Sequence, residues 1–249
     1  MDEVGIDIDG GVATITLNAP QRRNALTIEM ARALIAACDE VDADPSVGAV
    51  VIWGAGGYFC AGGERGTLAA AGTDPADPAT YTGMGELYRS FVRAGELEAP
   101  SIAAVEGGAV GAGMNLLLAT DLRVLATDAK LASGFIPIGL HPGGGHIGLL
   151  GRLAGRETAA ALALFGERLT GEQAVEAGLA HTAVPAGDVL ATAQRLAAVP
   201  GADPELSRRT VRSLRLELGP PALPWAAGLE LERPSQMWSM RRKHLDSGS

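Results

Sequence analysis

Hydrophobic and polar positions in the N-terminal part of the chain follow first a strand pattern and then a helix pattern. Residues 4–9 and 12–17 alternate on either side of two glycines, which predicts a β-hairpin. Thr27 has the side chain of a helix N-cap, and hydrophobic residues recur at helical spacing through 29–41. The apolar run 49–53 predicts a buried strand. The chain therefore begins as a β/α protein.

Strand and helix patterns continue to alternate as far as residue 185. Residues 66–80 are rich in alanine, glycine, aspartate and proline, which predicts a mobile loop. From residue 157 the patterns are helical, apart from a strand-like interval at 181–184. The other expected elements are strands at 101–105, 122–126 and 129–132, and helices at 81–94, 111–120, 143–153, 204–216 and 221–245.

The repeated strand–strand–helix units predict an α/β fold of a particular kind. We expect a coil of ββα turns rather than a doubly wound sheet. This core should occupy residues 1–185, and residues 186–249 should form a helical C-terminal region.

Charge and composition narrow the classes of partner. A net charge of −9 argues against non-specific binding to nucleic acid or to an anionic membrane. Local arginines could still bind a phosphorylated ligand. We expect the two cysteines, Cys38 and Cys60, to be reduced rather than joined in a disulfide. The sequence shows no signal peptide pattern and no apolar stretch long enough to span a membrane. We therefore expect a cytoplasmic location.

Two glycine clusters carry the candidate chemistry. Residues 58–64 (YFCAGGE) and 105–115 (VEGGAVGAGMN) each follow a predicted strand, and the second enters a predicted helix. Small residues let a ligand approach the backbone, and free N–H groups at a helix start favour negative charge. Two such turns facing each other could hold a developing oxyanion. Taken singly, either cluster is better explained as a simple tight turn.

The order of these clusters and of further short motifs resembles the crotonase (enoyl-CoA hydratase/isomerase) superfamily along nearly the whole chain. This resemblance implies a ββα spiral core, a C-terminal trimerisation region, and a homotrimer or hexamer. The motifs that carry it lie at residues 17–20, 23–26, 59–64, 100–107, 120–123, 139–145, 169–174 and 177–179.

The resemblance also implies roles for particular residues. The N–H groups of Gly63 and Ala112 would form the oxyanion hole. The remaining implied residues are on the coenzyme A side: the backbone near Ala61 and Gly62 for the adenine, Arg22 or Arg23 for the phosphates, Ala25 in the same motif, and Arg241 for coenzyme A bound by a neighbouring subunit.

The chain departs from the family at both of the glutamates that hydratases use. Asn115 stands at the first position and Phe135 at the second. Hydration needs one group to deprotonate water and another to protonate the α-carbon. Asparagine can orient a water but cannot exchange a proton at neutral pH, and phenylalanine can do neither. The usual hydration mechanism is therefore in doubt, and Phe135 is expected to line the acyl pocket.

Other side chains are candidates for acid–base work. His146 lies near a helix start, where the dipole favours its neutral form, and His141 precedes the same glycine turn. Glu64 follows the first oxyanion donor, where an acid more often ties down a loop. Glu86 is expected in the acyl pocket. No residue spacing indicates a metal site.

These observations favour an enzyme that processes an acyl-CoA through a thioester oxyanion or enolate. Coenzyme A would be part of the substrate, with no permanently bound cofactor. Decarboxylation, thioester hydrolysis and C–C cleavage all pass through such an anion, and remain open as alternatives to hydration and isomerisation. A non-catalytic paralogue that binds CoA thioesters is the alternative from another class.

Overall fold

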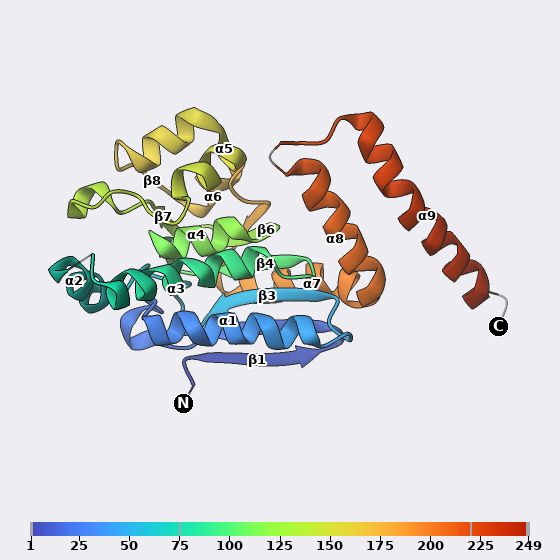
Figure 1. Cartoon of the computed structure of the whole chain (residues 1–249), viewed down its shortest axis with the longest axis horizontal. Coiled ribbons are helices and arrows are strands. Elements are labelled where there is room, and N and C mark those ends of the chain that lie inside the picture. Colours follow the sequence, from blue (N-terminus) through green and yellow to red (C-terminus); the bar gives the residue numbers. More distant parts are fainter. Residues whose placement is uncertain (1, 75, 220, 248–249) are drawn as a thin grey trace.

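A computed structural model describes residues 2–74, 76–219 and 221–247. The main sheet has six strands in the order β1-β2-β3-β4-β6-β9 (Figure 1). The predicted hairpin forms its antiparallel edge, and each later strand joins in parallel. Its strands are β1 (Val4–Asp9), β2 (Val12–Leu17), β3 (Ala49–Gly54), β4 (Ser101–Val105), β6 (Leu122–Ala126) and β9 (Thr182–Val184).

A smaller sheet of three strands lies beside the main one. It contains β5 (Gly108–Val110), β7 (Lys130–Ala132) and β8 (Arg168–Leu169), in the order β5-β7-β8. Successive stretches of chain contribute one strand to each sheet, first β4 and β5 and then β6 and β7. This arrangement confirms the predicted α/β fold with a ββα spiral core.

Helices cover the sheets and separate the turns of the spiral. α1 packs along α3, α3 along α4, and α7 against β2, β3, β4 and β6. The α-helices are α1 (Ile28–Ala43), α2 (Arg65–Thr73), α3 (Pro78–Gly95), α4 (Ala112–Ala119), α5 (His146–Ala163, interrupted at Gly155), α6 (Gly171–Glu176), α7 (Val189–Gly201), α8 (Pro204–Leu218) and α9 (Trp225–Ser247), with short 3-10 helices η1 (Pro20–Arg22), η2 (Ile136–Ile138) and η3 (Ala186–Asp188).

The segment predicted to be a loop at 66–80 is largely helical, so that prediction is wrong. Glu64 caps α2 by accepting the N–H of Thr67 at 2.7 Å. Asp77 caps α3 in the same way through the N–H of Thr80. The alanines between the caps have high helix propensity, which here outweighs the glycines of the segment.

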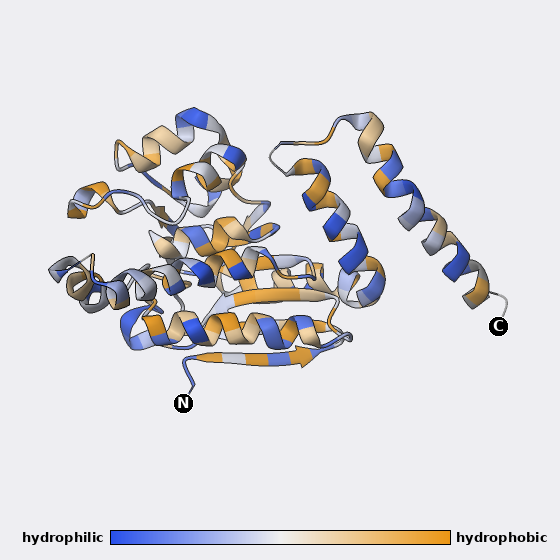
Figure 2. Ribbon diagram, in the orientation of Figure 1, coloured by the Kyte–Doolittle hydropathy of each residue, from blue (hydrophilic) through white to orange (hydrophobic). Residues whose placement is uncertain are grey.

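Figure 2 shows β3 coloured almost wholly hydrophobic. Many of the buried hydrophobic residues lie in the strands and in α1, α3 and α4. β2, β3 and β4 are buried over nearly their full length, as expected for parallel strands with both faces covered. Every residue of α4 from Ala112 to Leu118 is buried. This helix therefore starts in the centre of the molecule, and anything bound at its N-terminus lies against a rigid core.

The C-terminal helices pack in different ways. α7 lies on the main sheet, with Ala193 and Ala197 fully buried. α8 is attached by Arg208, which donates to the carbonyl oxygens of Val47 (3.0 Å) and Asp44 (2.7 Å). α9 extends away from the core and runs beside α8 (Figure 1).

Candidate active site

Main-chain hydrogen bonds join the two glycine-rich turns directly. The N–H of Cys60 donates to the carbonyl oxygen of Gly108 (3.3 Å), and the N–H of Val110 donates to the carbonyl oxygen of Cys60 (3.1 Å). Gly113 lies so close to the Cys60 carbonyl that a Cβ would overlap it. The main chain alone therefore fixes one turn relative to the other.

Gly63 and Ala112 line one cavity of about 310 Å³. Ala112 is the first residue of α4 and follows Gly111. The backbone φ of Gly111 is 55°, a conformation that glycine adopts with little strain and other residues do not. Within the described residues, neither the Gly63 nor the Ala112 N–H has a hydrogen-bond acceptor. A Cβ at Gly62 would lie 3.5 Å from the Ala112 nitrogen, so the first turn reaches the start of α4. Two unpaired donors thus belong to the same cavity.

The rest of the cavity wall is mostly apolar. Among the described residues that line it there is no carboxylate. Its larger apolar side chains are Leu68, Met84, Leu87, Val110, Phe135, Ile138 and Leu140, and its polar side chains are Tyr88, Asn115, Ser133 and His141.

His146 lies behind this wall, as the first residue of α5, and is 1% exposed. Its Nδ1 is 2.7 Å from Asn115 Oδ1, and its Nε2 is 2.7 Å from Ser133 Oγ. The ring of Phe135 packs edge-on against it, with 5.1 Å between centroids. Because Asn115 and Ser133 line the cavity, they connect the buried imidazole to it.

The hydrogen-bond partners define the tautomer of His146. Asn115 Nδ2 donates to the carbonyl oxygen of Gly143 at 3.0 Å, which identifies Oδ1 as the acceptor facing the imidazole. The proton therefore resides on His146 Nδ1, and Nε2 accepts the hydroxyl proton of Ser133. Burial lowers the pKa of His146 to about 4, so the ring is neutral near pH 7.

His141 occupies the exposed rim of the cavity. Its Nδ1 lies 2.7 Å from the carbonyl oxygen of Pro142. A carbonyl oxygen only accepts, so Nδ1 carries a proton and Nε2 is left with the lone pair when the ring is neutral. His141 therefore meets the cavity directly, whereas His146 meets it through its two partners.

The two glutamates singled out from the sequence are occupied elsewhere. The N–H groups of Gly66 and Thr67 lower the pKa of the Glu64 carboxyl, which caps α2. Glu86 forms an ion pair with Arg32 of α1. Neither glutamate lines the cavity. The expectation that Glu86 lies in the acyl pocket is not met at this cavity, because its carboxylate pairs with Arg32 of α1 instead.

The arginines expected near the phosphates differ in their freedom to bind them. Arg22 donates from both Nη atoms to the Glu3 carboxylate at 2.6 Å, and from Nε to the carbonyl oxygen of Ala25 at 2.8 Å. Arg23 is exposed and lies over the ring of Tyr58, 5.6 Å from its centroid. Arg23 therefore offers the freer positive charge.

The other residues expected on the coenzyme A side are not all close together. Ala61 and Gly62 line the cavity, and the N–H of Ala61 donates to the carbonyl oxygen of Arg23 at 3.0 Å. Ala25 is buried at 8% exposure beside the same loop. Arg241 is exposed on α9, outside the cavity lining.

Sequence reasoning missed two of the polar side chains in the cavity. Ser133 has no sequence signal, because its contact with His146 depends on how the loop after β7 meets the start of α5. Tyr88 could have been found, since it follows Met84 at helical spacing on α3 and both line the cavity. Cys60 is fully buried, and burial raises the pKa of its thiol to about 12, which makes it unreactive.

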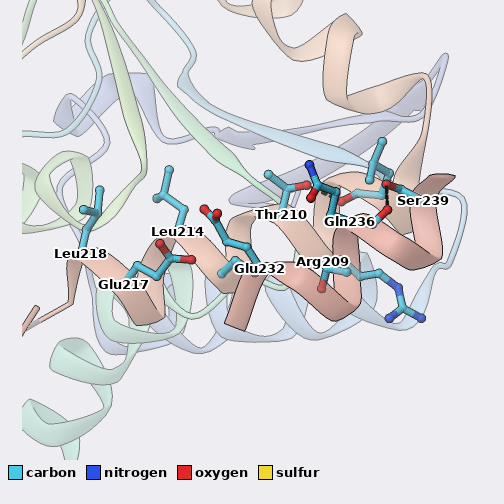
Figure 3. Close-up of a pocket in the computed structure, with 11 residues that line it drawn as sticks. Arg209, Thr210, Leu214, Glu217, Leu218, Glu232, Gln236 and Ser239 are labelled. Atoms are coloured by element: carbon cyan, nitrogen blue, oxygen red, sulfur yellow. Dashed lines mark hydrogen bonds between the residues drawn. The ribbon is translucent and has the colours of Figure 1, made fainter. Parts of the chain in front are cut away.

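A second hollow of about 470 Å³ lies between α8 and α9. Figure 3 shows Glu217 and Leu218 from α8 and Glu232 and Gln236 from α9 around it. None of the residues implicated from the sequence lines this hollow. This hollow shares no lining residue with the cavity at Gly63 and Ala112.

The described parts of the chain contain no group of three or more histidine, cysteine, aspartate or glutamate side chains placed to hold a metal ion. No described helix is both long and apolar enough to cross a membrane.

Comparison with known proteins gives a consistent assignment. The profile of the family described as Enoyl-CoA hydratase/isomerase matches residues 7–214. A probable enoyl-CoA hydratase of Mycobacterium tuberculosis is 42% identical over 89% of this chain and 91% of its own length. The 1,2-epoxyphenylacetyl-CoA isomerase of Escherichia coli is 39% identical over 76% of this chain and 72% of its own.

Comparison with solved structures supports the same family. The crystal structure of an enoyl-CoA hydratase from Polaromonas sp. superposes with a TM-score of 0.88 and 30% identity, covering 98% of this chain and 94% of that one. The motifs, the spiral fold and these similarities converge, and the chain is an enzyme that belongs to the enoyl-CoA hydratase/isomerase family.

Proposed function

We propose that the N–H groups of Gly63 and Ala112 hold the thioester oxygen of an acyl-CoA and stabilise the oxyanion or enolate formed from it. One observation carries this proposal: two N–H groups without acceptors open onto one apolar cavity from turns that the main chain joins. Fixed donors in a site with little water stabilise developing charge without reorganising. The start of α4 adds the positive end of a helix dipole at Ala112.

Direct hydration by two carboxylates is not the reaction that this cavity favours. Asn115 and Phe135 occupy the places of the two glutamates, and the described cavity lining offers no other carboxylate. The groups able to move a proton are His146, through Ser133, and His141 at the rim. Isomerisation, decarboxylation, hydrolysis and C–C cleavage remain compatible with an oxyanion hole supported by these groups.

The substrate carries its own coenzyme A, and the enzyme needs no permanently bound cofactor in this proposal. Ala61 and Gly62 would receive the adenine, and Arg23 would lie near the phosphates because Glu3 does not neutralise it as it does Arg22. The apolar lining suits a hydrocarbon or aryl acyl group. The likeness to 1,2-epoxyphenylacetyl-CoA isomerase supports including aryl-CoA thioesters among the substrates tested.

The test is a panel of enoyl-, β-keto-, malonyl- and aryl-CoA thioesters, with turnover and binding measured for the wild type. Crotonyl-CoA hydration should be at least about a thousandfold slower than in a relative with both glutamates, since each acid–base group contributes about 10²–10⁴. Hydration at the rate of that relative would refute the argument. Tight acyl-CoA binding without turnover of any panel member would favour the non-catalytic alternative.

The active assembly in this proposal is a homotrimer or hexamer. α9 extends from the core and exposes Leu229, Met237, Met240 and Leu245, which suits packing against another copy of the chain. Arg241 lies on the same helix and could reach coenzyme A bound to a neighbour. Light scattering at micromolar concentration should give a mass of three or six chains, and a stable monomer would contradict this.

A further inference from the structure

The hydrogen-bonded chain Ser133–His146–Asn115 has the connectivity of a nucleophile, a base and a group that orients the base. We propose that the cavity hydrolyses a CoA thioester through a covalent acyl-enzyme on Ser133, with His146 as base and Asn115 as its orienting partner. This proposal rests on the oxyanion hole of the proposed function and names the reacting group within it.

The directions of the hydrogen bonds fit a serine nucleophile activated by a histidine base. Ser133 donates its hydroxyl proton to His146 Nε2 at 2.7 Å, while His146 Nδ1 donates to Asn115 Oδ1 at 2.7 Å. An asparagine could in principle turn its amide nitrogen toward the imidazole and impose the wrong tautomer. Its bond to the Gly143 carbonyl prevents this, so Nε2 faces Ser133 with its lone pair.

The strand register places Ser133 beside the second oxyanion donor. Ala132 pairs with Val110 across β5 and β7, and the N–H of Gly111 donates to the Ala132 carbonyl at 3.2 Å. A Cβ at Gly111 would lie 3.7 Å from the carbonyl oxygen of Ser133. Gly111 immediately precedes Ala112, so the hydroxyl and the donor come from adjoining pieces of backbone on the cavity wall.

Of the two hydrogen-bond partners through which His146 meets the cavity, only Ser133 can exchange a proton with it. The imidazole is 1% exposed and both nitrogens have partners. Asn115 accepts a hydrogen bond from the Nδ1–H group but cannot itself take up or release a proton at neutral pH. Proton exchange with a substrate must therefore pass through the Ser133 hydroxyl. Burial lowers the pKa of the imidazole, so the ring is neutral at physiological pH and Nε2 holds a lone pair toward Ser133.

The reaction proceeds in two balanced steps. Ser133 Oγ attacks the thioester carbon, its proton passes to His146 Nε2, and the carbonyl oxygen becomes an anion held by the Gly63 and Ala112 N–H groups. The C–S bond then breaks, the Nε2 proton goes to the sulfur, and free coenzyme A leaves an ester on Ser133. A water molecule then attacks the carbonyl carbon of this ester while His146 Nε2 takes a proton from the water. The bond between the acyl carbon and Ser133 Oγ breaks, Nε2 returns the proton to Oγ, and the carboxylic acid departs.

The test follows coenzyme A release and the mass of the intact protein. Phenylacetyl-CoA, butyryl-CoA and decanoyl-CoA are mixed with the wild type, with Ser133→Ala, and with Ser90→Ala as a matched control. Ser90 is also fully buried, but its hydroxyl bonds to the carbonyl oxygen of Leu87 in its own helix, outside the cavity lining. A thiol reagent measures free coenzyme A, and peptide mapping locates any acyl group.

The wild type and Ser90→Ala should release coenzyme A from at least one thioester, with any acyl adduct on Ser133. Ser133→Ala should lose the adduct and release coenzyme A at least about 10²-fold more slowly. Equal release by Ser133→Ala, an adduct on another residue, or acyl-CoA binding with no release would overturn the serine mechanism and leave the oxyanion hole standing. Failure of the wild type to bind any thioester would instead refute the proposed function.

Discussion

Lowering the pH from 7 to 4 should destabilise the protein through His146. Folding buries this imidazole and lowers its pKa from 6.5 to about 4, with burial as the cause. Between these values the unfolded chain binds a proton that the folded protein does not, so stability falls as the pH falls. Each pKa unit corresponds to about 1.4 kcal/mol, which gives a loss of about 3 kcal/mol over this range.

The assay is urea unfolding at a fixed protein concentration across this pH range, for the wild type and for His146→Gln. His181→Gln is the matched control, since His181 is exposed. The wild type and His181→Gln should lose about 3 kcal/mol more than His146→Gln between pH 7 and 4. Parallel pH profiles for all three proteins would show that folding does not change the protonation of His146, and the argument from burial would fail.

Four further perturbations test the geometry and the assembly. Ala112→Pro removes one of the two proposed oxyanion donors at a first helical position, where proline is tolerated, so turnover on the best thioester should fall about 10²–10³-fold in a steady-state assay. Gly144→Ala places a Cβ against the ring of Phe91 and 2.8 Å from Asn115 Nδ2, at a position whose backbone φ is 68°. The free energy of unfolding, measured in urea, should fall by about 2–4 kcal/mol. Gly145→Ala, also at positive φ but with nothing within 4 Å, should cost only about 1–2 kcal/mol. Removing the chain from Pro221 onward should give monomeric or insoluble protein by light scattering, and an intact trimer or hexamer would contradict the assigned role of α9.

Many elements of the core could be predicted from the sequence because their local signals are strong, whereas the spiral arrangement followed chiefly from the family resemblance. The hairpin at β1 and β2, the Thr27 cap of α1 and the apolar strands all form where their patterns predict. The segment at 66–80 could not be assigned correctly from its composition. Its glycines and prolines indicate a loop, while two carboxylate caps and the alanine run stabilise helices there.

The candidate site was predictable only in part, and the reason is the distance along the chain over which it assembles. The two glycine-rich turns can be recognised from short stretches of sequence, and residues of both line one cavity. The contacts of His146 span 13 residues to Ser133 and 31 residues to Asn115. No period or motif links such positions, so the sequence suggested His146 and Asn115 separately and omitted the serine that lies between the imidazole and the cavity.

The bonds between Cys60 and β5 have a consequence for how this protein could be altered. They involve main-chain atoms only, so the spacing of the two turns that carry the proposed donors, Gly63 and Ala112, should depend little on the side chains that line the cavity. Met84, Leu87 and Phe135 contribute side chains to the cavity but none of these bonds. Exchanging them for larger or smaller residues should reshape the acyl preference while the donors keep their separation. The fold thereby separates the part of the site that must stay fixed from the part that can be redesigned.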